Sequence, residues 1–249
     1  MEKMIPSFIS EVSDDMKNAA IEALENEKFI FGESVFKFEE EFAKCIGTNH
    51  AISVNSGSSA LYLSLISKEI GKNSKVITST NSFVASANTI LMAGAQPILA
   101  DINNEDGNLN VNNLDKNVDA VIPVHIYGNP CDFDSIKEFT EESNIPVIED
   151  ACQAHGASYK GKKVGSLGTL GCFSFYPTKN MTVSGDGGMI TTSDDELAII
   201  LKSLRDNGRG ENNRSVHERV GFTMRLNTIN AAVGRVQLKK LDEFNNRRK

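Results

Sequence analysis

The sequence lacks the cysteine patterns that mark disulfide-rich and zinc-binding proteins. Its 4 cysteines, Cys45, Cys131, Cys152 and Cys172, lie far apart, and none forms a C-x-x-C pair. The sequence therefore predicts neither a disulfide framework nor a metal site. We interpret the cysteines as small packing residues, with nucleophilic chemistry at Cys152 as the alternative.

Basic clusters and long apolar runs are also missing. The net charge is −7, and the one basic cluster is the short Asn-Asn-Arg-Arg-Lys end, so nucleic-acid binding has little electrostatic support. No apolar run approaches the ~20 residues that cross a bilayer, and the N-terminus Met-Glu-Lys-Met-Ile-Pro has no signal-peptide core. The sequence predicts a cytoplasmic protein that binds neither nucleic acid nor membranes.

Strand-like and helix-like segments alternate along the chain. A hydrophobic content of 40% in 249 residues suffices for one large core. Repeated β-α-β units require right-handed crossovers and a mostly parallel sheet. The sequence thus predicts an α/β fold. Buried strands are expected over residues 51–54, 75–78, 97–100, 120–124 and 146–149. Helices are expected over 14–28, from Ser34 as a cap to Ile46, and from Ser82 onward.

Charged residues follow two of the apolar runs. Glu149 and Asp150 stand at the carboxyl end of one expected strand, where open α/β sheets bind their ligands. The run over 172–176 ends at Pro177, and Lys179 follows in a turn. A carboxylate and an amine thus meet at neighbouring strand ends. This pairing suits pyridoxal phosphate, whose aldehyde forms a Schiff base with lysine and whose ring nitrogen needs an acidic partner.

An anion-binding turn is expected at N-S-G-S-S, residues 55–59. Free N–H groups at a helix N-terminus bind phosphate, and Gly57 lets the backbone approach a ligand closely. The alternative is an ordinary helix capped by serine.

Together these features form an ordered series of motifs that covers nearly the whole chain. The series is F-I-F-G at 29–32, N-S-G-S-S-A-L at 55–61, S-F-V-A-S-A-N at 82–88, P-V-H-I-Y-G at 123–128, E-D-A-C-Q-A-H-G-A at 149–157, S-F-Y-P-T-K-N at 174–180, G-D-G-G-M at 185–189 and G-F-T-M-R-L-N at 221–227. Each motif alone is weak, but the ordered series is specific. In this series the chain resembles the nucleotide-sugar aminotransferases of the DegT/StrS type, which are fold type I pyridoxal-phosphate enzymes.

The resemblance implies a fold and a domain organisation. The fold is α/β, a three-layer sandwich with a mostly parallel mixed central sheet, as in the large domain of fold type I transferases. Residues 1–249 would form this cofactor-binding domain, with the helices of residues 1–47 packed on it. Members of the family continue into a smaller C-terminal domain. We expect that domain to be absent here, as in a fragment or one part of a split protein.

The resemblance also implies roles for individual residues around pyridoxal 5′-phosphate. Lys179 would be the catalytic residue, binding the cofactor covalently and then moving a proton. Asp150 would pair with the pyridine nitrogen, Gln153 would bond the phenolic oxygen, and Phe83 would stack on the ring. The phosphate would be bound by Ser174 and by the backbone of Gly57 and Ser58. Thr223 stands where many relatives carry an asparagine that reaches the phosphate of a neighbouring subunit, so a homodimer is expected.

The resemblance implies an aminotransferase that moves an amino group, from glutamate as donor, to a keto group of a nucleotide-linked sugar. Sugar dehydratases of the same family replace the lysine with histidine, so Lys179 favours amination. A dehydratase or another type I transferase is the first alternative. A truncated, catalytically silent large domain that acts as a dimer partner is the second.

Overall fold

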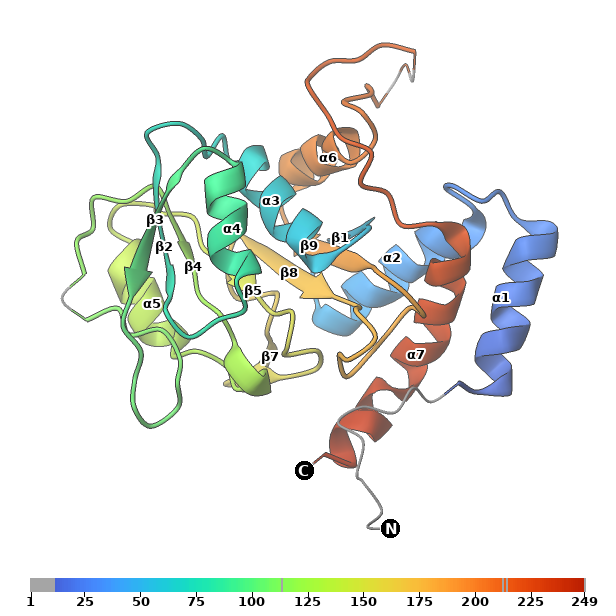
Figure 1. Cartoon of the computed structure of the whole chain (residues 1–249), viewed down its shortest axis with the longest axis horizontal. Helices are drawn as coiled ribbons and strands as arrows, with labels where there is room; N and C mark the ends of the chain where they lie inside the picture. The colour runs from blue at the N-terminus through green and yellow to red at the C-terminus, as the bar shows by residue number, and fades with distance from the viewer. Residues whose placement is uncertain (1–11, 113, 212, 214, 249) are drawn as a thin grey trace, which may run out of the picture.

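The computed structural model describes residues 12–112, 114–211, 213 and 215–248 (Figure 1). Its helices are α1 (Asp14–Asn26), α2 (Glu33–Ile46), α3 (Gly57–Ser67), α4 (Ala85–Met92), α5 (Phe133–Thr140), α6 (Asp195–Leu204) and α7 (Thr228–Asn246), with a short 3-10 turn η1 (Ile126–Gly128). Its strands are β1 (His50–Val54), β2 (Lys75–Ser79), β3 (Gln96–Ala100), β4 (Ala120–Ile122), β5 (Ile148–Asp150), β6 (Ser158–Tyr159), β7 (Lys162–Lys163), β8 (Leu170–Ser174) and β9 (Gly188–Thr192).

One mixed sheet runs through the molecule. Hydrogen bonds join β1, β9, β8 and β5 in that order, and join β3, β2 and β4. Parallel bridges between Val121 and Val147 and between Val124 and Asp150 place β4 beside β5. The order is therefore β1-β9-β8-β5-β4-β2-β3. Only β9 runs antiparallel to its neighbours in this order, so the predicted mostly parallel, mixed sheet is confirmed.

Alternate residues of the strands enter two different cores. In β8, Cys172 packs in the core beneath α3 and α6, whereas Phe173 packs against Phe42 of α2 on the opposite face. In β2, Val76 and Ile77 divide in the same way, and Ile77 joins the core beneath α5. This alternation follows from the two-residue period of a strand. Helices thus cover both faces of the sheet, which confirms the predicted three-layer sandwich.

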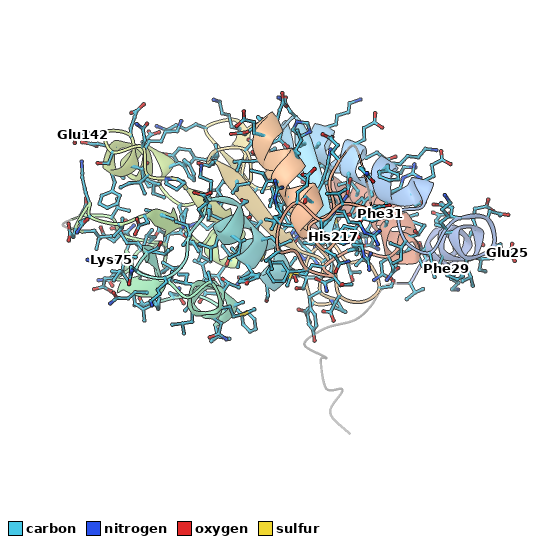
Figure 2. All side chains as sticks on the ribbon, turned by 90° about the horizontal axis from the view of Figure 1, so that it is seen from above. Glu25, Phe29, Phe31, Lys75, Glu142 and His217 are labelled. Carbon is cyan, nitrogen blue, oxygen red and sulfur yellow. The ribbon has the colours of Figure 1, made fainter. Side chains whose placement is uncertain are left out.

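The N-terminal helices lie against the C-terminal helix. Both α1 and α2 pack on α7, and α2 also contacts β1. Viewed from above, Glu25 of α1 and Glu142 beyond α5 lie at opposite ends of the long axis (Figure 2). Among the described residues, no helix combines the length and the apolar character needed to cross a membrane.

Two predicted helix starts are wrong. Gly32, rather than Ser34, caps α2. The N–H and hydroxyl of Ser34 instead donate to Glu27 at 2.7 and 2.6 Å. The helix expected from Ser82 begins at Ala85, so Phe83 stands in the turn before α4. The hydrogen bonds to Glu27 account for the first boundary, whereas the Ser82 hydroxyl bonds only locally, to Phe83 and Ser86.

Candidate active site

A cavity of about 380 Å³ opens at the carboxyl ends of β5 and β8, beside the N-termini of α3 and α4. It contains all the predicted site residues except Thr223. Its lining is Ser56, Gly57, Ser58, Leu61, Ser82, Phe83, Ala85, Asp150, Cys152, Gln153, Ser174, Tyr176, Thr178, Lys179 and Asp186. Thus Lys179 and Asp150, predicted to meet from separate strand ends, do share one cavity. Sequence reasoning missed Tyr176 and Thr178, although both stand in the S-F-Y-P-T-K-N motif.

The start of α3 has the geometry of an anion-binding cradle. The Ser56 side chain accepts a hydrogen bond from the Ser59 N–H at 3.0 Å, and the Ser56 carbonyl accepts from the next residue, Ala60. The N–H groups of Gly57 and Ser58 therefore remain at the positive end of the helix dipole. The serine cap is present, as in the alternative reading of this turn, and anion binding here stays a prediction.

Gly57 allows a very close approach between α3 and β8. A Cβ added at Gly57 would lie 2.7 Å from Ser174 Cβ and 2.9 Å from Cys152 Sγ. The Ser174 hydroxyl accepts from the Tyr176 N–H at 3.4 Å, which leaves its own proton for another partner. Two backbone N–H groups and one hydroxyl thus converge, and this donor set fits a phosphate group.

Asp150 is a buried carboxylate with both oxygens in hydrogen bonds. Asp150 is only 6% exposed. Oδ2 accepts from the Ser86 hydroxyl at 2.7 Å, and Oδ1 accepts from the Cys152 N–H at 3.2 Å. Ser86 is a neighbour that sequence reasoning missed, although it stands in the S-F-V-A-S-A-N motif. These bonds fix the orientation of the carboxylate.

The adjacent acid, Glu149, serves the fold instead. It is fully buried and accepts from the N–H groups of Gly165, Leu167 and Gly168 at 2.7, 2.8 and 2.7 Å. His125 Nδ1 accepts from a backbone N–H at 3.0 Å, so the proton is on Nε2, which donates to Glu149 at 3.0 Å. Because every neighbour of Glu149 is structural, only Asp150 of the acidic pair serves the cavity.

Gln153 is oriented by a backbone group. Its Oε1 accepts from the Tyr127 N–H at 3.1 Å. Because this N–H can only donate, the amide nitrogen of Gln153 is the group left to donate into the cavity. That donor suits an anionic oxygen.

Lys179 lies in a turn that is fixed on both sides. Its N–H bonds the Tyr176 carbonyl at 2.8 Å, as the expected turn requires. The next residue, Asn180, donates to the His155 carbonyl at 3.0 Å and to Asn245 Oδ1 of α7 at 2.8 Å. Asn245 donates to the same His155 carbonyl at 2.8 Å. The position of Lys179 therefore depends on three separate elements.

Two other titratable side chains stay uncharged. Burial, and then the neighbouring Asp150, raise the pKa of the Cys152 thiol well above its usual value, which disfavours the reactive thiolate. Burial, and then the charge on Lys179, lower the pKa of His155 to about 4. His155 packs its ring against Phe173 and Phe175. Both residues are packing groups of the site.

Thr223 lies outside the cavity. Its hydroxyl donates to Asn207 Oδ1 at 2.9 Å, and the segment between α6 and α7 projects from the body of the molecule (Figure 1). Arg225 donates to Asp206 at 2.7 Å and so ties the two ends of this projection together. Within one chain Thr223 does not join the other site residues, and its contact with a second chain stays a prediction.

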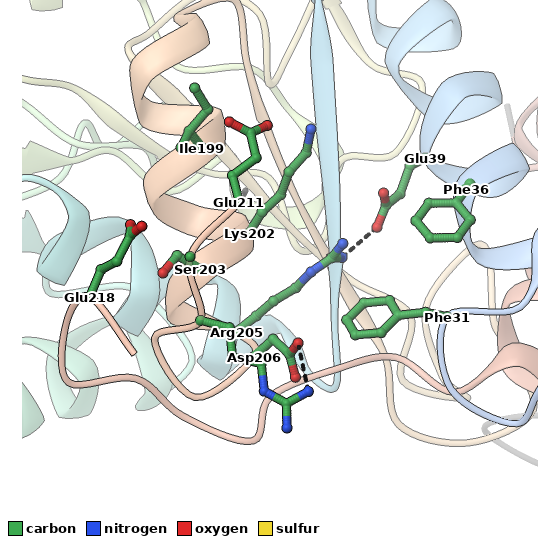
Figure 3. A pocket seen from close by; sticks show the side chains of 12 residues that line it. Phe31, Phe36, Glu39, Ile199, Lys202, Ser203, Arg205, Asp206, Glu211 and Glu218 are labelled. Atoms are coloured by element: carbon green, nitrogen blue, oxygen red, sulfur yellow. Dashed lines mark hydrogen bonds and ion pairs between the residues drawn. The ribbon is translucent and has the colours of Figure 1, made fainter. Parts of the chain in front are cut away.

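A second cavity, of about 240 Å³, contains none of the predicted site residues (Figure 3). Its most buried member, Arg205, pairs with Glu39 and donates to the Ser53 carbonyl at 2.7 Å. The Arg205 guanidinium also lies 5.2 Å from the ring centre of Phe31, in the F-I-F-G turn. These contacts anchor the base of the projecting segment, so we assign them to the fold.

Comparisons with known proteins place the chain in a family. The model of the DegT/DnrJ/EryC1/StrS aminotransferase family matches residues 10–249. The chain belongs to this family. Among curated relatives of the family, it is 43% identical to the GDP-perosamine synthase of Caulobacter vibrioides, over 85% of this chain and 58% of that protein. It is 37% identical to the dTDP-3-amino-3,4,6-trideoxy-alpha-D-glucose transaminase of Streptomyces venezuelae, over 92% of this chain and 61% of that protein.

Solved structures of family members share the fold. Streptomyces venezuelae DesV, solved in complex with a ketimine intermediate, superposes with a TM-score of 0.89 at 36% identity, covering 94% of this chain and 63% of DesV. The aminotransferase from Psychrobacter cryohalolentis superposes with a TM-score of 0.90 at 32% identity, covering 94% of this chain and 63% of that enzyme. These matches confirm the predicted family and fold. The chain spans about three fifths of the length of these relatives.

The close approach at Gly57 is testable by adding one methyl group. Gly57→Ala should lower the free energy of unfolding by about 1–3 kcal/mol, because the new Cβ overlaps Ser174 and Cys152. It should also remove the stabilisation that inorganic phosphate gives to a chain with an intact cradle. Urea unfolding with and without phosphate measures both effects. Gly71→Ala is the matched control, since its nearest neighbour would be a carbonyl oxygen 3.5 Å away. Equal behaviour of the two variants would contradict the assignment.

Proposed function

We propose that this protein is a pyridoxal 5′-phosphate-dependent aminotransferase, which moves an amino group from glutamate to a keto group of a nucleotide-linked sugar. The observation that carries the proposal is the shared cavity of Lys179 and Asp150, with the N-terminus of α3 at its edge. An amine, a buried carboxylate and an anion cradle are the three groups that pyridoxal phosphate requires of a protein. Family membership supports the same chemistry.

Different residues bind different parts of the cofactor. Gly57, Ser58 and Ser174 bind the phosphate, and Gln153 donates to the phenolic oxygen. Phe83, at 67% exposure, stands at the rim and packs on the ring once the cofactor is bound. Stacking contributes only about 0.5–1.5 kcal/mol beyond burial, so Phe83 adjusts affinity and leaves the chemistry to Lys179 and Asp150.

Two residues control protons. When bound, pyridoxal phosphate supplies an electron sink for charge that develops next to the amino group. Asp150 holds a proton on the ring nitrogen: two unit charges about 3 Å apart at an effective dielectric constant of about 20 attract by about 5 kcal/mol before desolvation. Lys179 would hold the cofactor covalently until the amino group of the donor replaces it, which frees Nζ. The free Nζ would then take a proton from the carbon that bears the amino group and deliver it to the carbon on the other side of the nitrogen.

Amination is favoured over the dehydratase alternative by Lys179 itself, because the sugar dehydratases of this family carry histidine at that position. The substrate class is supported by relatives whose names state a GDP-linked or dTDP-linked amino sugar. A silent dimer partner would have no need for the arrangement of Lys179, Asp150 and the cradle. The cytoplasmic location expected from the sequence stays a prediction.

A homodimer would complete the cavity. The aromatic side chains Phe83 and Tyr176 line it yet are 67% and 51% exposed, and the neighbouring Tyr127 is 77% exposed. Exposed aromatic side chains beside a cavity are typical of an interface. In this arrangement the projecting segment of one chain brings Thr223 to the phosphate of the other.

The covalent role of Lys179 is tested by trapping the cofactor. Borohydride reduction of the protein incubated with pyridoxal 5′-phosphate, followed by peptide mapping, should find the pyridoxyl group on Lys179. Lys179→Ala should abolish turnover while the phosphate contacts retain some cofactor, because the two contributions are separate. Lys160→Ala, which removes a surface ion pair with Asp134, is the control. A label on another lysine would defeat the assignment.

The dimer is tested by light scattering and by Thr223. The cofactor-loaded protein should be a dimer, because residues of both chains would complete each site. Obligate interfaces of this kind commonly bury more than about 2,000 Å². Thr223→Val should weaken cofactor binding by about 1 kcal/mol, the contribution of one hydrogen bond. Cofactor binding by a monomer would exclude the shared site, and an unchanged affinity in Thr223→Val would leave this residue without its proposed contact.

A further inference from the structure

A chain of two hydroxyl groups leads from the cavity to the buried side of Asp150. Ser82 Oγ lies 2.6 Å from Ser86 Oγ, and Ser86 Oγ lies 2.7 Å from Asp150 Oδ2. Ser82 lines the cavity, whereas Ser86 is 1% exposed and does not. Ser86 is thus within reach of the carboxylate but is separated from any bound ligand.

The direction of these hydrogen bonds follows from the chemistry of the groups. An ionised carboxylate only accepts, and a serine hydroxyl has one proton to donate. Ser86 therefore donates to Asp150. The Ser82 hydroxyl has two acceptors within reach, Ser86 Oγ at 2.6 Å and the Phe83 carbonyl at 3.1 Å, and donation along the shorter contact completes the chain. Successive donation polarises the chain and strengthens the final bond, which is already favoured because its acceptor is charged.

We propose that Ser86, supported by Ser82, is a positioning residue that keeps the Asp150 carboxylate turned toward the ring nitrogen. This assignment rests on the proposed function. The Cys152 N–H holds the other carboxylate oxygen at 3.2 Å, so the two donors together prevent rotation of the side chain. Ser86 acts through Asp150 and touches neither cofactor nor substrate.

A double-mutant cycle tests this coupling. The affinity for pyridoxal 5′-phosphate is measured by equilibrium titration of its visible absorption band in the wild type, Ser86→Ala, Asp150→Asn and the double variant. Ser86→Ala should bind roughly tenfold more weakly, on the scale of one hydrogen bond to a charged group. In the Asp150→Asn background, Ser86→Ala should cause no further loss, because the charge on which Ser86 acts is gone.

Three further variants separate positioning from simple packing. Ser86→Thr keeps the hydroxyl and should restore most of the affinity. Ser82→Ala should lower the cofactor affinity by a smaller factor, and this variant replaces Ser86→Ala in the test if Ser86→Ala fails to fold. Ser64→Ala removes an equally buried hydroxyl, bonded to Cys172 at 3.2 Å, and should leave cofactor affinity unchanged.

The possible failures are distinct. If the wild type binds pyridoxal phosphate and Ser86→Ala binds it equally well, the role of Ser86 is overturned and the proposed function stands. The same holds if the Ser86→Ala change costs as much affinity in the Asp150→Asn background as in the wild type. If the wild type shows no binding, both are overturned.

Discussion

The arrangement of the site depends on the end of β5, where two consecutive acids point to opposite faces of the sheet. Glu149 enters one face and accepts three backbone N–H groups and the His125 proton. Asp150 enters the other face and meets Ser86. A buried carboxylate without partners would be very costly. The hydrogen bonds of the Glu149 carboxylate therefore hold β5 in place, and with it the direction of Asp150.

The same network places β8 beside β5. The N–H groups that Glu149 accepts belong to residues 165–168, directly before β8. The register of the pair then sets Asp150 opposite Cys172, and the turn after β8 carries Lys179. Asp150 and Lys179 thus reach one cavity because Glu149, which has no catalytic contact itself, fixes where the parallel strands β5 and β8 end. The proposed contact of Asp150 with the ring nitrogen would follow from this strand geometry.

Much of this could be predicted from the sequence. Alternating apolar segments gave the α/β fold, and the ordered motifs gave the family and the residues of the cavity. The remainder depends on contacts that local patterns do not encode. Ser86 and Asp150 are 64 residues apart, and no spacing rule joins them. The same holds for Glu27, whose bonds to Ser34 displaced a predicted cap. Thr223 lies outside the cavity of its own chain, and its contact with a second chain stays a prediction.

The central claim is that Asp150, held as described, keeps the ring nitrogen of pyridoxal phosphate protonated. The most direct measurement is the nitrogen-15 NMR shift of ring-labelled cofactor bound to the protein at neutral pH. The wild type should show a protonated pyridine nitrogen, and Asp150→Asn should show an unprotonated one, since the amide supplies no compensating charge. An unprotonated nitrogen in the wild type, or a protonated one in both proteins, would contradict this account.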